Sequence, residues 1–292
     1  MVTARRSPTV RRRRLGFELR RLREQAGFTI QQVAARLECS DSKISRIETG
    51  QVSATPRDVR DILELFGVAG AQRDELVQIA REARLKGWWH TYDDRVIRAL
   101  IGFEAAAATI RTYHSLLVPG LLQTVDYARA VTHAVRPDLS ASEVERRVEV
   151  RTARQIHLPQ EDPPSLSVVL DEAALRRPVG GSAVMSQQLR HLVEVAGLPN
   201  VRLQVLPFAA GVHAGMDGSF TIIGFPEPED PEVVYLENAT SDLYLEEPDD
   251  VRRYSVLFER ISAAAMEPDA SGVLLSDLVK ELQDLGNHSE QS

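Results

Sequence analysis

The sequence predicts a helical part at the N-terminus, followed by a larger α+β part. Apolar residues recur at helical spacing between residues 15 and 85, whereas short strand-like runs alternate with helical patterns between residues 87 and 266. Charge divides the chain in a similar way: the first 60 residues carry a formal charge of +8, and the other 232 carry −15. We therefore predict a mostly α protein in which an all-α domain of about five helices precedes an α+β domain.

Composition excludes several classes of site and partner. The one cysteine, Cys39, cannot form an internal disulfide or a cysteine-rich zinc site. The seven histidines are never three or four residues apart, so we expect no helical metal pair and no bound metal. No apolar run approaches the roughly 18–20 residues of a membrane helix, and no secretory apolar stretch follows the N-terminal arginines. We expect a cytoplasmic protein with no membrane partner.

The helical part begins with a strongly basic stretch. Residues 1–14 hold four consecutive arginines and few apolar side chains, and we expect them to form a flexible basic arm. A domain over residues 15–85 follows, and its first helix has an apolar stripe made of Leu15, Leu19 and Leu22. Two segments with the spacing of a capping box predict the starts of further helices, Thr29–Gln32 and Thr55–Asp58.

The second domain is predicted over residues 87–266. Its strand-like runs, several of them bounded by Pro or Gly, are residues 165–171, 201–207, 219–225, 232–237 and 243–246. Its helical patterns are residues 124–135, 142–158, 182–196 and 249–265. Late in this region the strands outnumber the helices that could cross between them, which favours α+β over a doubly wound sheet. The last two strand-like runs predict a hairpin, and residues 267–292 predict a final helix with a disordered tail.

The strongest motif lies in residues 29–50. Ala34 is small enough to stand where two helices cross at a tight turn, and Ile44 and Ile47 follow it by 10 and 13 residues, which is helix-turn-helix spacing. Ser40 is placed to cap the second helix. The predicted core residues of the motif are Ala34, Leu37, Ile44 and Ile47. The alternative is a helical hairpin with an ordinary charged surface. In that case the cap, the small residue and the apolar spacing would have to coincide by chance.

The same spacing leaves one side of the second helix exposed. The outward side chains near its start are predicted to read bases, and they are Asp41, Ser42, Ser45 and Arg46. Among them, Arg46 can grip the O6 and N7 atoms of guanine with two donors. Basic side chains around the motif are predicted to contact phosphates, and they are Lys43, Arg57, Arg11, Arg12, Arg13 and Arg14. The pattern therefore predicts binding of double-stranded DNA through the major groove.

These residues also carry a family resemblance. Residues 15–66 resemble the helix-turn-helix domains of the λ repressor and Cro (XRE) type, and residues 42–50, SKISRIETG, are similar to their recognition-helix signature. The resemblance implies a recognition helix that docks in the major groove. A dimer would place two such helices in successive grooves of a near-palindromic operator.

The chain departs from that family pattern at three positions. Ile30 stands where these domains usually carry a phosphate-binding Gln, so Gln31 or Thr29 would take over that phosphate contact. Glu38 replaces a Gly of the turn, where a positive φ would cost about 1 kcal/mol. Asp41 stands where a Gln often reads a base, and a carboxylate would prefer the N4 donor of cytosine. The resemblance thus implies the docking mode and leaves the target sequence open.

Six segments of the C-terminal part carry a second resemblance. They are GWW at residues 87–89, IRTY at 110–113, VPGLLQT at 118–124, VLDEAALRRPVGG at 169–181, QVLP at 204–207 and HAGMDG at 213–218. Together they resemble the domain of unknown function that is attached to XRE-type regulators throughout the actinobacteria. That family contains antitoxin-like regulators, often encoded beside a very small protein that they bind. The resemblance implies a cytoplasmic, dimeric regulator of nearby genes and names no ligand.

Other chemistry-bearing residues favour structural roles. His213 and Asp217 flank a glycine-rich turn that leads into a strand, and the turn is favoured over a metal ligand or general base. Asp171, near Arg176, favours a helix cap with surface pairs over an anchor for a polar ligand. Cys39 favours a small buried hydrophobe over an oxidation sensor.

Together, the patterns predict a sequence-specific DNA-binding transcriptional regulator that acts as a homodimer on an operator. No phosphate loop, nucleophile motif or paired-carboxylate motif occurs, so we expect no enzyme activity, no catalytic residue and no cofactor. The acidic C-terminal domain is predicted to supply dimer contacts and to sense a ligand or a small protein partner. The alternative is an antitoxin-like protein that mainly sequesters a small cognate protein, with DNA binding secondary.

Overall fold

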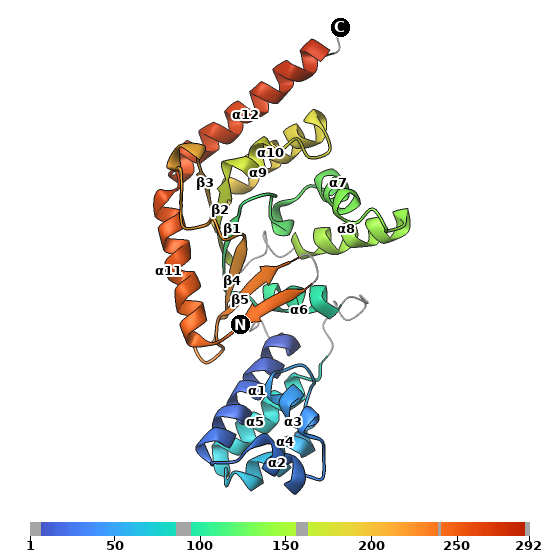
Figure 1. Ribbon diagram of the computed structural model, residues 1–292, viewed down its shortest axis with the longest axis vertical. Helices are drawn as coiled ribbons and strands as arrows, with labels where there is room; N and C mark the ends of the chain where they lie inside the picture. The colour runs from blue at the N-terminus through green and yellow to red at the C-terminus, as the bar shows by residue number, and fades with distance from the viewer. Residues whose placement is uncertain (1–6, 86–94, 156–162, 239–240, 290–292) are drawn as a thin grey trace. The chain divides into compact units, whose positions relative to one another are not determined.

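The computed structural model describes residues 7–85, 95–155, 163–238 and 241–289 (Figure 1). The chain divides into two compact units, of which unit 1 comprises residues 1–107 and 225–231, and unit 2 comprises residues 108–224 and 232–292. The predicted domain boundary at residues 86–87 and the GWW segment at residues 87–89 lie outside the described residues. Among the described residues, no helix has both the length and the apolar character that crossing a membrane requires.

Unit 1 is helical. Its helices are α1 (Pro8–Gln25), α2 (Ile30–Arg36), α3 (Asp41–Glu48), α4 (Pro56–Leu65), α5 (Gly70–Glu82) and α6 (Arg95–Glu104). The first five confirm the predicted all-α N-terminal domain. Both predicted capping boxes are present, at the starts of α2 and α4. Each box provides partners for two backbone N–H groups that the first turn of a helix leaves unbonded.

The apolar stripe of α1 lies in the core of unit 1. Leu15 and Leu19 are each 1% exposed and pack with apolar residues of α3, α4 and α5, as their i, i+4 spacing predicts. Gly16 lies so close to α3 that a Cβ atom there would be 2.6 Å from the carbonyl oxygens of Ile47 and Glu48. The absence of a side chain at Gly16 therefore allows α3 to pack directly on α1.

The start of α1 corrects the predicted flexible arm. Residues 8–14 form the first two turns of α1, and the hydroxyl of Ser7 accepts a hydrogen bond from the backbone N–H of Thr9 at 3.2 Å. Pro8 occupies the first position of the helix, where its missing N–H costs nothing. Residues 1–6 of the predicted arm lie outside the described residues. The basic stretch is therefore helical from Pro8 onwards.

Unit 2 is built on a six-stranded mixed sheet with the strand order β3-β2-β1-β4-β5-β6. The strands are β1 (Thr109–His114), β2 (Ser165–Asp171), β3 (Val201–Leu206), β4 (Phe220–Gly224), β5 (Val233–Glu237) and β6 (Asp242–Leu245). Strands β1, β2 and β3 are parallel, and β4, β5 and β6 continue from β1 in antiparallel fashion. The sheet confirms the α+β class and the five predicted strands, and β5 and β6 form the predicted hairpin. The central strand β1 was not predicted.

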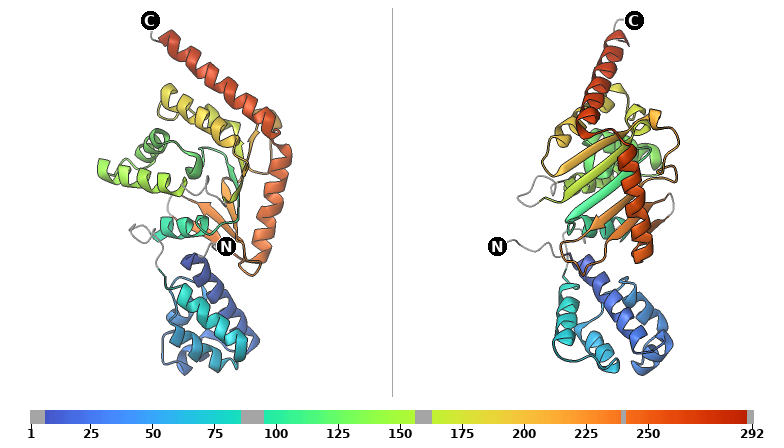
Figure 2. Two further views of the ribbon diagram at one scale, coloured as in Figure 1. Left: turned by 180° about the vertical axis from the view of Figure 1, so that it is seen from behind. Right: turned by 90° about the vertical axis from the view of Figure 1, so that its left-hand side faces the viewer.

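Helices cover both faces of this sheet (Figures 1 and 2). They are α7 (Val125–Val135), α8 (Ala141–Gln155), α9 (Glu172–Arg176), α10 (Ser182–Ala196), α11 (Pro248–Ala264) and α12 (Pro268–Ser289), with short 3-10 turns η2 (Gly120–Leu122) and η3 (Phe208–Ala210). Helix α11 lies across one face, where Phe258 and Ile261 pack on Phe220 and Val234 of the sheet. Helices α7, α8 and α10 lie on the other face, and α12 packs along α10. The predicted disordered tail is helical as far as Ser289.

Candidate nucleic-acid interface

Helices α2 and α3 form the compact pair that the sequence predicted. Ala34, Ile44 and Ile47 are 1%, 2% and 3% exposed, and Leu37 is partly buried against them. The predicted cap of α3 is present, since the hydroxyl of Ser40 accepts a hydrogen bond from the backbone N–H of Lys43 at 3.2 Å. The burial of these small and branched side chains fixes which side of α3 faces the core and which side faces solvent.

The turn between the two helices contains the strain that the family resemblance implied. Glu38 has a φ of 52° and is the only non-glycine residue with a positive φ in the described part of the chain. The backbone N–H groups of Glu38 and Cys39 donate to the carbonyls of Ala35 and Ala34 at 3.4 and 2.9 Å, which closes the end of α2. A residue with a Cβ atom loses about 1–2 kcal/mol of stability in this left-handed region, whereas a glycine adopts the same conformation without that cost.

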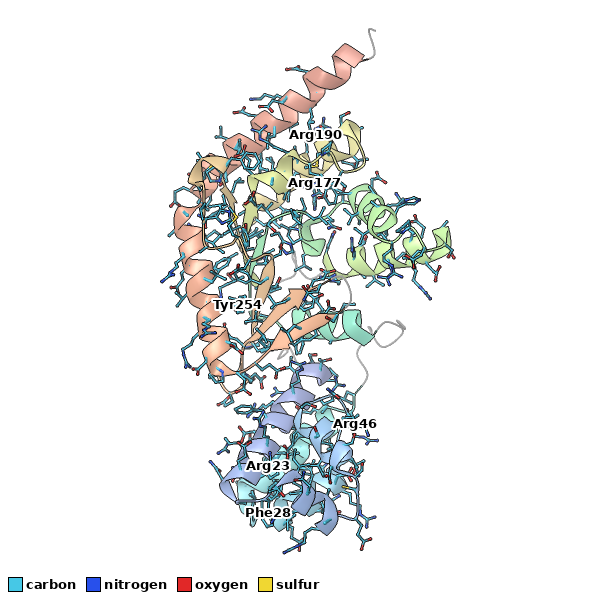
Figure 3. The ribbon with its side chains drawn as sticks, in the orientation of Figure 1. Arg23, Phe28, Arg46, Arg177, Arg190 and Tyr254 are labelled. Carbon is cyan, nitrogen blue, oxygen red and sulfur yellow. The ribbon has the colours of Figure 1, made fainter. Side chains whose placement is uncertain are left out.

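The four predicted base-reading residues lie together at α3. Asp41, Ser42 and Arg46 are exposed, and Ser45 is half-buried. The Nε of Arg46 donates to the backbone carbonyl of Ser42 at 3.1 Å, so the guanidinium lies along the outer side of the helix (Figure 3). One carboxylate, two hydroxyls and one guanidinium therefore lie on α3 away from the side that Ile44 packs into the core.

Three of the predicted phosphate contacts are exposed at the starts of α2 and α4. The hydroxyl of Thr29 accepts from the backbone N–H of Gln32 and keeps its own proton available as a donor. Gln31 is exposed in the first turn of α2. The side chain of Arg57 is 88% exposed in the first turn of α4, with its Nε 3.9 Å from a carboxylate oxygen of Asp61. These residues stand at helix N-termini, where free backbone N–H groups favour anions.

Lys43 has a partner inside the domain. Its Nζ donates to Oδ1 of Asp58 at 2.8 Å, which joins α3 to the first turn of α4. The hydrogen bond to Asp58 raises the pKa of Lys43 above its ordinary value, against the opposing effect of burial. Burial alone would raise the pKa of Asp58, but hydrogen bonds from Lys43 and Thr55 outweigh it and lower the pKa. The ammonium predicted to contact phosphate thus also positions α4 against α3.

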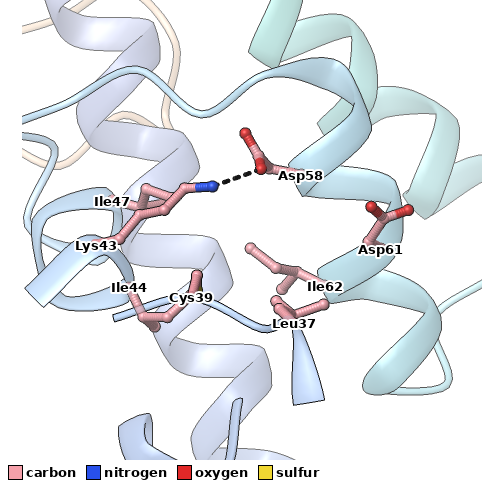
Figure 4. Close-up of a pocket in the computed structure, with 8 residues that line it drawn as sticks. All are labelled: Leu37, Cys39, Lys43, Ile44, Ile47, Asp58, Asp61 and Ile62. Carbon is pink, nitrogen blue, oxygen red and sulfur yellow. Dashed lines mark hydrogen bonds and ion pairs between the residues drawn. The ribbon is translucent and has the colours of Figure 1, made fainter. Parts of the chain in front are cut away.

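A small hollow lies between α3 and α4 beside this ion pair (Figure 4). It is lined by Leu37, Cys39, Lys43, Ile44, Ile47, Asp58, Asp61 and Ile62. Cys39 is partly buried there and packs against the cluster of Val33, Ala34 and Ile44, which agrees with its interpretation as a small apolar residue.

The arginines at the start of α1 have partners within unit 1, which corrects their assignment as phosphate contacts. Arg11 is buried, with ion pairs to Glu82 at 3.4 Å and Asp230 at 3.7 Å. The remaining contacts are those of Arg12 with the carbonyl of Gly50 at 2.6 Å, Arg13 with the ring centroid of Phe103 at 4.8 Å, and Arg14 with Glu75 at 2.9 Å and Asp230 at 3.6 Å. Their acidic and aromatic partners are distant in sequence, so residues 11–14 by themselves could not indicate this role.

One buried ion pair escaped the sequence-based interpretation. Arg23 of α1 donates to the carboxylate of Glu48 from Nε at 2.7 Å and from Nη2 at 3.0 Å, and the two side chains are only 10% and 6% exposed. The Nη1 atom of Arg23 also donates to the carbonyl of Phe28 at 2.9 Å (Figure 3). Glu48 is the last residue of α3, so the pair holds that helix against α1.

In unit 2, the turn that contains His213 has a structural role. His213 Nε2 lies 3.4 Å from Oδ2 of Asp171, and its Nδ1 accepts from the backbone N–H of Gly215 at 3.1 Å. Asp171 caps α9 through the N–H of Ala173, as predicted. In the described part of the chain, no group of three or more His, Cys, Asp or Glu side chains could hold a metal ion.

Two family models match the chain. A helix-turn-helix domain matches residues 14–76, and a domain of unknown function, DUF5753, matches residues 97–277. Searches of curated proteins and of solved structures found no match. The first match covers α1 from residue 14 onwards, all of α2–α4 and the first half of α5, and the second covers all six strands of the sheet. Because the second match spans more than half of the chain, the protein belongs to the DUF5753 family, and it carries a helix-turn-helix domain at its N-terminus.

Proposed function

We propose that the protein is a sequence-specific DNA-binding transcriptional regulator of the XRE type that reads bases with α3. The observation that carries this proposal is the exposure of Asp41, Ser42 and Arg46 on one helix whose opposite side is fixed by Ile44 and Ile47. An α-helix fits the major groove, where every base pair presents a distinct pattern of donors and acceptors. Arg46 would bind a guanine, and Asp41 would accept from the N4 group of a cytosine.

Phosphate contacts would flank this helix. Thr29, Gln31 and Arg57 are exposed at the N-termini of α2 and α4, and Lys43 is 41% exposed beside them in its ion pair with Asp58. Contacts of this kind set the register of a protein on the duplex without reading its sequence. Since each phosphate contact releases counterions, binding should weaken steeply as the salt concentration rises.

Regulation would require a second copy and a signal. A homodimer would place two α3 helices in successive major grooves, with half-sites ~34 Å apart on a near-palindromic operator. Unit 2 would supply the dimer contacts and would sense a ligand or a small protein, in a cytoplasmic setting. A signal bound there would change operator affinity by a coupling free energy of about 1–3 kcal/mol. The proposal assigns the chain no catalytic residue and no cofactor.

A second candidate is an antitoxin-like role, in which the chain mainly sequesters a small cognate protein. Phe208, Val212 and Met216 favour it, because apolar side chains exposed on unit 2 suit a protein partner. The C-terminal segments also resemble a family that contains antitoxin-like regulators, often encoded beside a very small protein that they bind. Co-purification with the product of an adjacent short gene, unaffected by operator DNA, would support this role.

Selection from a pool of random duplexes with the full chain tests the primary proposal. The expected result is one enriched motif with two related half-sites, and a footprint on the promoter of the protein's own gene that contains this motif. A footprint repeated in the presence of the neighbouring small protein would show whether that protein alters binding. Retention of duplexes without any enriched motif would overturn sequence-specific recognition.

A further inference from the structure

Three arginines lie on one side of α8 in unit 2. Arg147, Arg151 and Arg154 follow one another at i, i+4 and i+7 and are half-buried, whereas Arg146 on the same helix is exposed. Helix α8 packs on α7 and on the turn η2 (Figure 1). Because like charges at this spacing destabilise a helix, helix stability does not explain the three arginines.

The middle arginine is held by a neutral partner. Nη1 of Arg151 donates to Oε1 of Gln123 at 2.8 Å, and Gln123, which is only 5% exposed, donates from Nε2 to the carbonyl of Val118 at 2.7 Å. Among the described residues, Gln123 is the only hydrogen-bond partner of the Arg151 guanidinium, and no carboxylate oxygen lies within 4.0 Å of it. A guanidinium has five N–H donors, so most of those of Arg151 are not used by the described part of the chain.

The turn η2 joins this arginine to a second one. Gln155 donates from Nε2 to the carbonyls of Gly120 and Gln123 at 3.1 and 2.6 Å. A Cβ atom on Gly120 would be only 3.3 Å from Nη1 of Arg154, so the glycine leaves room for that guanidinium. Burial, together with the charge of Arg154, lowers the pKa of His114 at the end of β1 to about 4. The ends of α8 and β1 and the turn η2 therefore form one positively charged cluster.

This cluster is unusual in an acidic domain. Burial and the charge of Arg154 lower the pKa of Arg151, and the opposing charge of Glu237 is the smaller effect. Elsewhere in unit 2, Arg111 and Arg129 pair with carboxylates at 2.9 and 2.6 Å, and the chain beyond residue 60 carries a formal charge of −15. A guanidinium that leaves water without a carboxylate partner loses free energy, which an anion from outside the chain would restore. Ionisable groups perturbed in this way are typical of functional sites.

We propose that Arg151, with Arg154 beside it, binds the phosphate or carboxylate group of a small molecule. A guanidinium matches either group, because two of its N–H donors can bond two oxygens of one anion. Since Arg151 bonds to an oxygen of the buried Gln123, its guanidinium is recessed and suits a small molecule better than a folded protein. The inference deepens the proposed function, because it rests on unit 2 as the sensing unit and names the chemistry of the signal.

Calorimetric titration of the full chain with pyrophosphate, and separately with citrate, tests the proposal at constant ionic strength. At least one of the two anions should bind at one site per chain, and the stronger of the two shows whether the site prefers phosphate or carboxylate. Arg151→Gln should weaken this binding roughly 10-fold or more, because hydrogen bonds between charged groups are lost. The matched control is Arg146→Gln, which removes the same charge from the exposed side of α8 and should bind the anion as the wild type does.

Thermal unfolding without the anion separates a binding role from a structural one. Arg151→Gln should unfold at the same temperature as the wild type or above it, because it removes a partly buried charge that no described carboxylate pairs with. A lower melting temperature with unchanged anion affinity would make Arg151 a structural residue. Arg151→Lys keeps the charge without the two-pronged geometry, and it should bind the anion with intermediate affinity.

Three results would overturn the proposal: no binding of either anion to the wild type, equal loss of affinity in Arg151→Gln and Arg146→Gln, or full affinity in Arg151→Gln. If Arg151→Gln loses a small cognate protein and the wild type binds neither anion, the cluster belongs to that protein and the proposal is wrong.

The titration contains no DNA, so its outcome is separate from that of the duplex selection. Anion binding through Arg151 by a chain that selects no motif contradicts DNA recognition alone. A selected motif bound by a chain that takes up neither anion contradicts the anion site alone. Operator affinity measured with and without the bound anion then tests the sensing role, and an unchanged affinity would show that this anion is not the signal.

Discussion

Arg23 and Glu48 form a buried, bidentate ion pair that joins α1 to the last residue of α3. The hydrogen bond to Glu48 raises the pKa of Arg23, although burial opposes this shift. Because the third contact of the guanidinium is the carbonyl of Phe28, just before α2, one side chain fixes both helices of the pair relative to α1. The base-reading surface proposed for α3 thus depends on a residue that faces the core.

Replacing Arg23 tests this dependence. Arg23→Met should lower the free energy of unfolding of unit 1 by about 3–5 kcal/mol, because it leaves the carboxylate of Glu48 buried without its partner. Urea denaturation with hydrogen exchange read out in α1 and α3 measures the change. The matched control is Arg20→Met on the same helix, whose pair with Glu24 is half-exposed and should contribute less than about 1 kcal/mol. Equal losses in the two variants would contradict the structural role of the buried pair.

The left-handed conformation of Glu38 predicts a stabilising substitution. Glu38→Gly should raise the free energy of unfolding by about 1 kcal/mol, since glycine adopts a positive φ without the clash that a Cβ atom causes. Ala35→Gly, three residues earlier in the last turn of α2, is the control and should be destabilising by about 0.5–1 kcal/mol. Chemical denaturation of the full chain compares the two. A loss of stability in Glu38→Gly would show that the strain is not relieved in this way.

The proposed division between base and phosphate contacts can be tested with two arginines. Arg46→Ala should cost about 1–3 kcal/mol on the selected operator and relax the base preference at one position. Arg57→Ala should weaken binding to all duplexes alike and reduce the slope of log K against log salt by about 1. Binding isotherms on matched and mismatched duplexes at several salt concentrations measure both. A uniform loss in Arg46→Ala would make Arg46 a phosphate contact.

The lowered pKa of Asp58 predicts a pH dependence of stability. The pKa of an Asp in an unfolded chain is about 3.9. In the folded chain burial would raise the pKa of Asp58, but hydrogen bonds from Lys43 and Thr55 outweigh burial and lower it. The carboxylate therefore contributes stability above about pH 4, and this contribution is lost as the pH falls through the lower folded pKa. Asp58→Asn should be less stable at neutral pH and should lose less stability on acidification between roughly pH 5 and pH 2.

Equilibrium unfolding of the Asp58→Asn variant at a series of pH values gives this comparison. Asp61→Asn serves as the control, since Asp61 lines the same hollow and its place in α4 is outside the capping box. The control should keep the acid sensitivity of the wild type. If Asp58→Asn kept it as well, the Lys43–Asp58 pair would not link the starts of α3 and α4 energetically.

Short-range patterns predicted those elements whose partners lie nearby in the chain. Thr29 and Gln32 are three residues apart, and Ala34 and Ile44 meet across one turn, so their roles can be inferred from spacing alone. Strands β2 to β6 are apolar runs bounded by turn residues, and these were predicted as well. Strand β1 was missed because Arg111 and His114 interrupt its apolar pattern. It is a strand because residues 165–170 and 220–224 bond its two edges.

The sequence by itself determined the starts of α2, α3 and α4, the spacing of α2 and α3, the α+β class of the second part and the residues left outside on α3. Only the tertiary structure decided that Arg11 and Arg14 are held by Glu82, Glu75 and Asp230, and that Arg23 holds Glu48. The physical reason is that capping and periodicity act within a few residues, whereas a charged side chain is satisfied by whichever opposite charge the fold brings near it. From the sequence alone, a run of arginines therefore indicates a solvated arm. The carboxylates that pair with these arginines become apparent only when the packing of α1 is known.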